Sequence, residues 1–193
     1  MTNLKGSKTA KNLLKAFAGE SQARNRYTYA AYIAKKEGYR QIEAIFQETA
    51  DNEKEHAGIF FRYLNDLGVP LEITASYPAG KIGTTEENLL VAANGEKEEW
   101  GELYPNFKEV AEKEGFNDVA SSFKEIAEVE EQHEKRYRKL LENVKNGKVF
   151  KKDEVVKWKC RNCGYVHEGK DAPALCPACE HKQEYYEVLC ESY

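Results

Sequence analysis

Two short segments of the chain, EKEH (residues 53–56) and EEQH (residues 130–133), have the same arrangement of acid and imidazole. Residues three apart lie on one face of an α-helix. Glu53 with His56, and Glu130 with His133, can therefore each present a carboxylate and an imidazole toward one point. Donors of this kind, repeated twice in one chain, are typical of a metal centre inside a helical bundle.

Three further glutamates extend this candidate ligand set: Glu20, and the pair Glu96 and Glu99, which are again three apart. Di-iron carboxylate bundles take one glutamate from each of two helices and a Glu-x-x-His pair from each of the other two. The chain contains that set and adds Glu99. Oxygen ligands with a minority of imidazoles suit iron or manganese better than zinc or copper. We therefore predict two iron ions in a di-iron oxo/carboxylate site.

The alternative for any single Glu-x-x-His pair is an ordinary solvated helix face. Here the flanking residues argue for burial, because Glu20 has Phe17 and Ala23 at helical spacing and Glu53 has Ala57. Ionised carboxylates buried together without cations would cost many kcal/mol or stay protonated. Two iron ions would offset most of that charge, so the pattern favours a metal site.

Two tyrosines follow the first-helix and third-helix glutamates at similar distances. Tyr27 lies seven residues after Glu20, and Tyr104 lies eight residues after Glu96. They are either plain core aromatics or hydrogen-bond donors to ligand carboxylates, the usual partners that orient such ligands.

The C-terminal region contains a second candidate metal site of another kind. Its cysteines form two C-x2-C pairs separated by twelve residues: Cys160, Cys163, Cys176 and Cys179. Four thiolates at this spacing make a tetrahedral site that can hold zinc or a single iron. Because the site accompanies a redox-active di-iron bundle, we predict one iron that acts as an electron relay, with zinc substitution possible. The fifth cysteine, Cys190, is outside the pattern and is predicted to be an ordinary buried or partly exposed thiol.

Four long helices must position the first set of donors. Their predicted ends are glycines, at Gly38, Gly68, Gly115 and Gly147, as expected for residues just past a helix. Thr84 and Glu87 have the spacing of a capping box at the start of the third helix. Pro105 lies inside that helix and should bend it.

The two halves of the helical region resemble each other. Residues 34–56 and 111–133 are identical at 9 of 23 positions without a gap, including the glutamate and histidine of each pair. The segment between the halves, residues 69–83, is rich in Pro and Gly and long enough for a crossover connection. We predict a mainly α fold: a four-helix bundle over residues 1–146, a charged linker over residues 147–156, and a small metal-held domain over residues 157–193.

Bulk properties exclude several other functions. The net charge is −4, so no basic surface invites nucleic acid. No apolar run is long enough to span a membrane, and the N-terminus lacks the apolar stretch of a signal peptide. The cytoplasm is the expected location.

Together these motifs resemble the rubrerythrin family across essentially the whole chain. The resemblance implies a ferritin-like bundle with a rubredoxin-like tail, and a non-haem di-iron peroxidase of the NADH peroxidase type. Glu53 and Glu130 would bridge the irons, Glu20 would be terminal on one, and Glu96 with His133 would serve the other. It also implies that Glu99 and His56 alternate on the first iron, and that they take part in catalysis together with Tyr27 and Tyr104. One departure from rubredoxin-type sites is Glu180, at a position usually occupied by glycine.

The implied reaction is reduction of hydrogen peroxide to water during oxidative stress. Because no nucleotide-binding motif is visible, electrons must come from a protein donor, a rubredoxin or a reductase, through the four-cysteine iron. The resemblance further implies a homodimer in which one tail faces the other bundle. Iron storage by a ferritin-like protein and a zinc-dependent binding module remain as alternatives, and oligomer size and metal content distinguish them.

Overall fold

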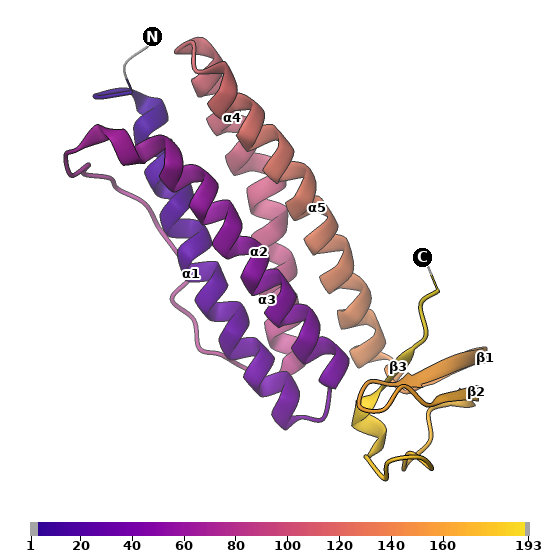
Figure 1. Ribbon diagram of the computed structural model, residues 1–193. Coiled ribbons are helices and arrows are strands. Elements are labelled where there is room, and N and C mark those ends of the chain that lie inside the picture. The colour runs from indigo at the N-terminus through magenta and orange to yellow at the C-terminus, as the bar shows by residue number, and fades with distance from the viewer. Residues whose placement is uncertain (1–3, 192–193) are drawn as a thin grey trace.

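The computed structural model describes residues 4–191: a long helical bundle with a small sheet domain at one end (Figure 1). The helices are α1 (Lys8–Lys36), α2 (Arg40–Leu64), η1 (Asn65–Leu67), α3 (Thr85–Glu98), η2 (Glu99–Leu103), α4 (Tyr104–Lys113) and α5 (Asn117–Lys145). α1 pairs with α2, while α3, η2 and α4 continue one another and pack against α5. Within residues 4–191 no helix combines the length and apolarity needed to cross a bilayer.

The helix ends are capped by local hydrogen bonds, and the capping box and the glycine ends agree with the predictions. Ser7 accepts a hydrogen bond from the Ala10 amide (2.9 Å) at the start of α1. Thr84 and Glu87 form the expected capping box at the start of α3. Gly38 follows α1 with a φ of 80°, a conformation that glycine adopts without steric cost. The crossover between α2 and α3 has no regular secondary structure and runs along the side of the bundle (Figure 1).

The interior of the bundle consists of two apolar clusters with a charged layer between them. One cluster contains Tyr27, Phe46 and Tyr137, and it occupies the half nearer the sheet domain. The other contains Phe60 and Phe123 and occupies the opposite half. Burial of these side chains stabilises the bundle by roughly 1.5–3 kcal/mol per large side chain. The layer between the clusters is where the glutamates and histidines of the repeated motif lie.

The third predicted helix is continuous but contains a π-helical segment. Pro105 was expected to bend it, and the structure places a π-helical segment, η2, immediately before α4, with Pro105 in the first turn of α4. Proline lacks the N–H that an uninterrupted helix needs at that position. Single π-turns of this kind recur at functional sites, and η2 begins with Glu99.

The C-terminal domain is a three-stranded antiparallel sheet in the order β2-β1-β3, with β1 (Lys151–Cys160), β2 (Val166–Asp171), η3 (Gln183–Tyr185) and β3 (Tyr186–Val188). The expected linker over residues 147–156 is wrong for its second half, because residues 151–156 belong to β1. The register of β1 against β2 shifts between Lys151 and Val156. Residues 151–156 are exposed or half-buried, and the first four are charged, so this segment of β1 resembled a linker.

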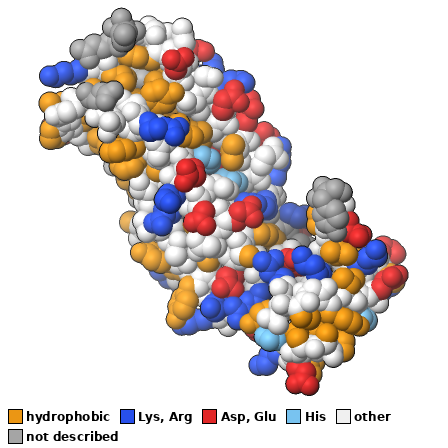
Figure 2. All heavy atoms as spheres, in the orientation of Figure 1, with side chains coloured by type: hydrophobic (Ala, Val, Ile, Leu, Met, Phe, Trp, Pro, Cys, Tyr) orange, Lys and Arg blue, Asp and Glu red, His pale blue; other side chains and the backbone are white. Residues whose placement is uncertain are grey.

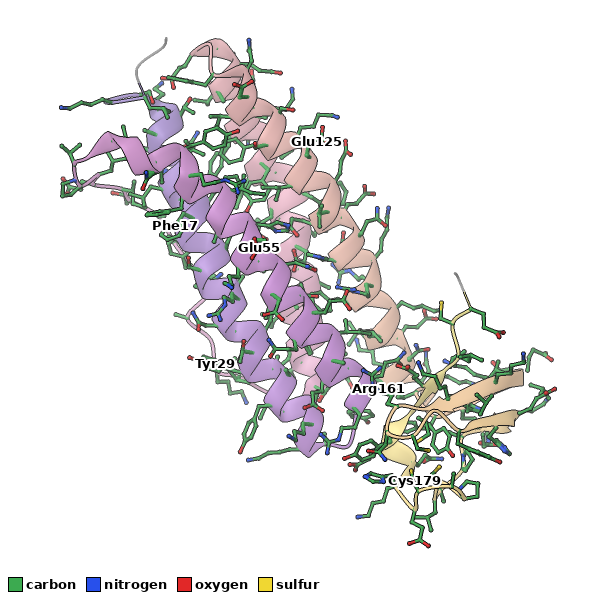
Figure 3. The ribbon with its side chains drawn as sticks, in the orientation of Figure 1. Phe17, Tyr29, Glu55, Glu125, Arg161 and Cys179 are labelled. Atoms are coloured by element: carbon green, nitrogen blue, oxygen red, sulfur yellow. The ribbon has the colours of Figure 1, made fainter. Side chains whose placement is uncertain are left out.

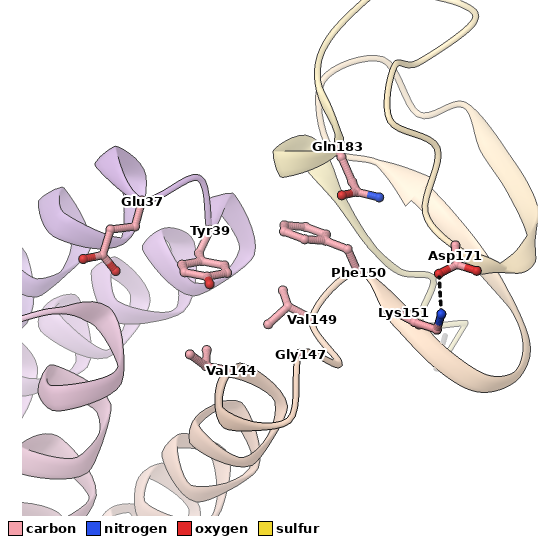
Figure 4. Close-up of a pocket in the computed structure, with 9 residues that line it drawn as sticks. All are labelled: Glu37, Tyr39, Val144, Gly147, Val149, Phe150, Lys151, Asp171 and Gln183. Carbon is pink, nitrogen blue, oxygen red and sulfur yellow. Dashed lines mark ion pairs between the residues drawn. The ribbon is translucent and has the colours of Figure 1, made fainter.

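The sheet domain contacts the end of the bundle near the α1–α2 turn. Arg40 donates a hydrogen bond to the Tyr185 hydroxyl (2.8 Å), and its guanidinium lies 4.7 Å from the centre of that ring. Tyr39 stacks on Phe150 at 6.1 Å with an angle of 10° between the rings. A cavity of about 340 Å³ lies beside this stack, between the two domains (Figure 4). The junction is therefore held by a few specific contacts around an incompletely filled space.

Replacing Glu180 by glycine should stabilise the sheet domain. Glu180 has a φ of 59°, and it is the one residue other than glycine with a positive φ among those described. The left-handed conformation costs an L-residue about 1 kcal/mol, which glycine avoids. We expect thermal bleaching of the iron–sulfur absorption to occur at a higher temperature in Glu180→Gly. In Glu168→Gly, a control at an exposed strand position with an ordinary φ, it should occur at a lower temperature. A lower temperature for Glu180→Gly would contradict this.

Candidate metal centres

Six buried polar side chains form the layer between the two apolar clusters. They come from the bundle rods as follows: Glu20 from α1, Glu53 and His56 from α2, Glu96 from α3, and Glu130 and His133 from α5. Each helix contributes its donors on its inward face because they continue the helical spacing of the apolar core residues. The structure thus brings together all members of the predicted set except Glu99.

The donor atoms form two overlapping groups. Glu20, Glu53, His56 and Glu130 place one ligand atom each within 4.8 Å of one another, and Glu53, Glu96, Glu130 and His133 do the same. Glu53 and Glu130 belong to both groups. Two metal ions that share two carboxylates fit this arrangement.

Several of these atoms lie within ion-pair distance of one another. His133 Nδ1 is 2.7 Å from Glu130 Oε2, and His56 Nδ1 is 2.8 Å from Glu130 Oε1. Atoms without any hydrogen-bond partner include Glu20 Oε2, Glu53 Oε1, Glu96 Oε2, both Glu130 carboxylate oxygens and His133 Nδ1. Buried polar atoms are nearly always paired. Cations bind where several unpaired carboxylate oxygens converge on one point. The residues present therefore fit a pair of iron ions.

The electrostatics of the protein alone show the same need for positive charge. Burial, followed by the charges of the other carboxylates, raises the pKa of Glu20 and of Glu96 well above the ordinary range. Burial opposes the charge on His56, but contacts with Glu130 and Glu53 outweigh it and raise its pKa to about 10. The same balance raises the pKa of His133 to about 12. Without metal, protons bound to these groups offset the negative charge.

Glu99 lies beside the two groups and outside both of them. It is the first residue of η2, and its Oε1 lies 3.8 Å from the position that a Cβ on Gly19 would occupy. Burial, then the charge of Glu20, raises the pKa of Glu99 well above its ordinary value. The carboxylate is therefore close to the Glu20 end of the site.

Both predicted tyrosines donate hydrogen bonds to glutamates of the site. The Tyr27 hydroxyl donates to Glu96 Oε1 at 2.5 Å, and the Tyr104 hydroxyl donates to Glu20 Oε1. Both rings are buried, with 7% and 1% of their surface exposed. Each bond crosses from one helical hairpin to the other, so the tyrosines orient the glutamates as well as filling the core.

Sequence reasoning did not single out a third buried tyrosine, Tyr137. Its ring lies 5.5 Å from Tyr27 in an edge-on arrangement, and burial raises its pKa well above the ordinary value. It follows His133 by one helical turn on α5, so it lies on the same face. That spacing was the available signal.

The four cysteines of the two C-x2-C pairs lie together in the sheet domain, with sulfur atoms within 4.8 Å of one another. Cys160 and Cys176 are fully buried in a small core with Trp158 and Tyr186. The amide of His181 donates to the Cys179 sulfur and lowers the pKa of that thiol to about 6. Such lowering favours the thiolates that bind metal. Cys190 is exposed and lies outside the group.

Comparison with known proteins agrees with both sites. The family profile described as Rubrerythrin matches residues 11–141, and that described as Rubrerythrin, rubredoxin-like domain matches residues 158–187. A rubrerythrin of Porphyromonas gingivalis is 59% identical, covering 99% of this chain and 94% of its own.

Two solved structures have the same fold. Fully reduced, all-ferrous nigerythrin matches with a TM-score of 0.64 and 29% identity, covering 96% of this chain and 91% of its own. Desulfovibrio desulfuricans bacterioferritin, in which different catalytic states of the di-iron site were studied, matches with a TM-score of 0.63 and 26% identity, covering 73% of this chain and 82% of its own.

Fold and sites define a ferritin-like carboxylate bundle with a di-iron site, joined to a rubredoxin-like domain with a four-cysteine iron site. The matches over nearly the full length narrow this class further. The chain belongs to the rubrerythrin family.

The stability of the metal-free protein should fall as the pH rises. Glu20, Glu96 and Glu99 hold protons in the folded state that the unfolded chain releases above their ordinary pKa of 4.5, so their contribution declines above that value. His56 stabilises the fold below its ordinary 6.5, and this is lost toward about 10. Burial opposes the charge on Glu130, but contacts with His133 and His56 outweigh it and lower its pKa, so Glu130 acts against this trend.

Iron loading should reverse this dependence of stability on pH, because acid protonates the ligands and releases the metal. Thermal unfolding at about pH 5.5 and about pH 8.5 tests both statements. Metal-free protein should melt higher at the acidic pH and iron-loaded protein at the alkaline one. Higher stability of the metal-free protein at alkaline pH would contradict the assignment.

Proposed function

We propose that this protein is a peroxidase that reduces hydrogen peroxide to water at the di-iron site and protects the cell against oxidative stress. Electrons reach that site through the four-cysteine iron. The observation that supports this most directly is the layer of buried carboxylates between the two apolar clusters. Several of their oxygens have no hydrogen-bond partner, and the same chain has a four-thiol site. An iron-storage protein would need the layer of carboxylates but not the four-thiol site.

The two overlapping donor groups support the assignment of ligands. Glu53 and Glu130 belong to both groups and are proposed to bridge the irons. Glu20 and His56 complete one iron site, and Glu96 and His133 complete the other. The proposed domains are the bundle over residues 1–146 and the rubredoxin-like domain over residues 157–193, with β1 of the latter beginning earlier, at Lys151.

Reduction of one hydrogen peroxide to two waters takes two electrons and two protons, and the paired irons, when bound, supply the electrons. The protein supplies position and protons. Tyr104 Oη holds a proton against Glu20, and Tyr27 Oη holds one against Glu96. The two tyrosines thereby keep the terminal carboxylates oriented and place donors at both ends of the site.

Glu99 and His56 are proposed as alternative ligands of the same iron. In the structure His56 is inside the donor group and Glu99 is beside it. A neutral imidazole suits the reduced metal, and a carboxylate suits the harder oxidised one. The π-helical segment that begins at Glu99 provides local freedom for its carboxylate to approach.

Electron transfer is proposed to use a second copy of the chain. The sheet domain contacts Arg40 at the start of α2, and Glu53 lies thirteen residues further along that helix, about 20 Å away at 1.5 Å per residue. The cysteine cluster lies beyond that contact, in the part of the domain marked by Cys179 in Figure 3. A homodimer that places one tail against the other bundle shortens this path. The external donor is a rubredoxin or a reductase in the cytoplasm.

The experiment is to reduce the iron-loaded protein, mix it anaerobically with hydrogen peroxide, and follow reoxidation by absorbance. We expect complete reoxidation, at least about tenfold faster with peroxide than with O2. Faster reaction with O2, together with assembly into a large shell, would indicate iron storage instead.

A further inference from the structure

A pocket of about 260 Å³ lies beside the di-iron site, on the side of Glu99. Its walls come from α1, from the crossover and from the rod made of α3, η2 and α4. Among the residues that line it are Gly19, Tyr77, Gly95, Glu99 and Tyr104. Two of these connect it to the chemistry: Tyr104 donates to Glu20, and Glu99 is the proposed alternative ligand.

The size of the pocket suits a small substrate. A water molecule in the liquid takes up about 30 Å³, so the pocket holds hydrogen peroxide with room to spare. The volume equals that of about nine such waters, so exclusion of a bulky hydroperoxide depends on the entrance, where Tyr77 of the crossover lines the pocket.

Two glycines at equivalent places in the duplicated hairpins keep the pocket open. Gly19 precedes Glu20, and Gly95 precedes Glu96. Each costs about 1 kcal/mol relative to alanine in a helix interior. A Cβ on Gly95 would meet nothing within 4 Å, and one on Gly19 would meet only ordinary contacts at 3.8 Å, with Glu99 and Tyr77. Helix packing therefore does not require a glycine at either position. The missing side chains leave open space next to the metal ligands Glu20 and Glu96.

Tyr77 covers this space from the crossover. Its ring lies beside Gly19, and its hydroxyl donates to the Lys15 carbonyl oxygen at 2.9 Å. The side chain is 38% exposed, so one side of the ring faces solvent while the other faces the pocket. This hydrogen bond joins the ring to α1.

The histidines lie toward a different face of the bundle. Figure 2 shows histidine surface about halfway along the bundle, between α2 and α5, and His56 and His133 are the two histidines of the helical region. Only 7% and 4% of these residues is exposed. This face offers little opening, whereas the pocket at Glu99 offers a defined volume.

We propose that the pocket between α1, the crossover and η2 is the route by which substrate enters, and that Tyr77 restricts it to hydrogen peroxide and small hydroperoxides. The identity of the substrate rests on the proposed peroxidase function. The entry route rests on the pocket itself.

The first test compares hydrogen peroxide with cumene hydroperoxide as oxidants of the reduced, iron-loaded protein. The wild-type protein should prefer hydrogen peroxide strongly. Tyr77→Ala should reduce this preference by at least about tenfold. Tyr77→Phe, which keeps the ring, should retain it. Tyr29→Ala is the matched control, because Tyr29 is an exposed tyrosine on the outer side of α1 (55% exposed; Figure 3) and outside the pocket. An unchanged preference in Tyr77→Ala overturns the role of Tyr77.

The second test does not depend on turnover. Azide binding to the oxidised iron centre is followed by absorbance in the wild type and in Gly95→Leu, which fills the pocket from a position with room for a side chain. We expect azide to associate at least about tenfold more slowly in Gly95→Leu, with unchanged iron content. Unchanged association would overturn the route and indicate entry from the histidine face. If no hydroperoxide oxidises the wild type, the peroxidase function and the role of Tyr77 both fail, while the azide result still decides the route.

Discussion

Replacing Glu53 by alanine should remove both iron ions from the bundle and lower the rate of reaction with peroxide by at least about a thousandfold. Glu53 is 1% exposed and belongs to both donor groups. Its Oε2 lies 2.8 Å from His56 Nδ1, and its Oε1 lies 3.3 Å from His133 Nδ1. Loss of one shared carboxylate therefore disrupts both ends of the site. Iron analysis should fall from about three ions per chain to about one.

The metal-free form of this variant should fold at least as well as the metal-free wild type. Replacing a buried ionic group by an apolar one is often neutral or stabilising by about 1–4 kcal/mol. Glu55→Ala is the matched control, because Glu55 lies two positions further on α2 and is exposed (Figure 3). It should keep all iron and the full rate. Two bundle irons retained in Glu53→Ala would show that the shared carboxylate is not a ligand.

Replacing Cys176 by alanine should separate the two functions of the chain. Cys176 is fully buried in a core of few residues, so a domain this small depends on its metal, which contributes on the order of 10 kcal/mol to folding. We expect loss of one iron per chain and unfolding of the sheet domain. Turnover driven by a protein electron donor should fall by at least about a hundredfold.

The bundle of the Cys176→Ala variant should remain competent. After chemical reduction, the rate of its single-turnover reaction with peroxide should stay within about threefold of the wild-type rate. Cys190→Ala, at an exposed cysteine outside the group, should behave as the wild type. Protein in which zinc occupies the four-cysteine site keeps the fold and lacks the redox centre, so it distinguishes a relay from a structural role. Donor-driven turnover that survives with zinc would disprove the relay.

The ends and faces of the helices could be predicted from the sequence because they depend on local chemistry. The Thr84 and Glu87 capping box forms as expected, since its hydrogen bonds join residues three apart. The boundary of the sheet domain could not be placed, because residues 151–156, KKDEVV, are mostly charged and join a strand through pairing of Lys151 and Val156 with β2. Pro105 indicated a bend, but the π-helical form of η2 depends on how that rod packs against α5.

The candidate site divides in the same way. Spacing alone placed Glu53 with His56 and Glu130 with His133, because a helix brings residues three apart to one face. Which carboxylates are shared by the two groups, and that Glu99 lies beside them, depend on how the two hairpins meet. The partners of Tyr27 and Tyr104 also required the fold, since each hydroxyl reaches a glutamate of the opposite hairpin.

The sequence by itself determined the chemistry of this protein: which donors exist, which helix carries each, and that four thiols form a second site. Those properties follow from residue type and from periodicities of three or four residues. Only the tertiary structure decided the distances between helices, the pocket beneath Tyr77 and the separation of the cysteine site from the carboxylates. These depend on packing between segments far apart in the chain, which local periodicity does not encode.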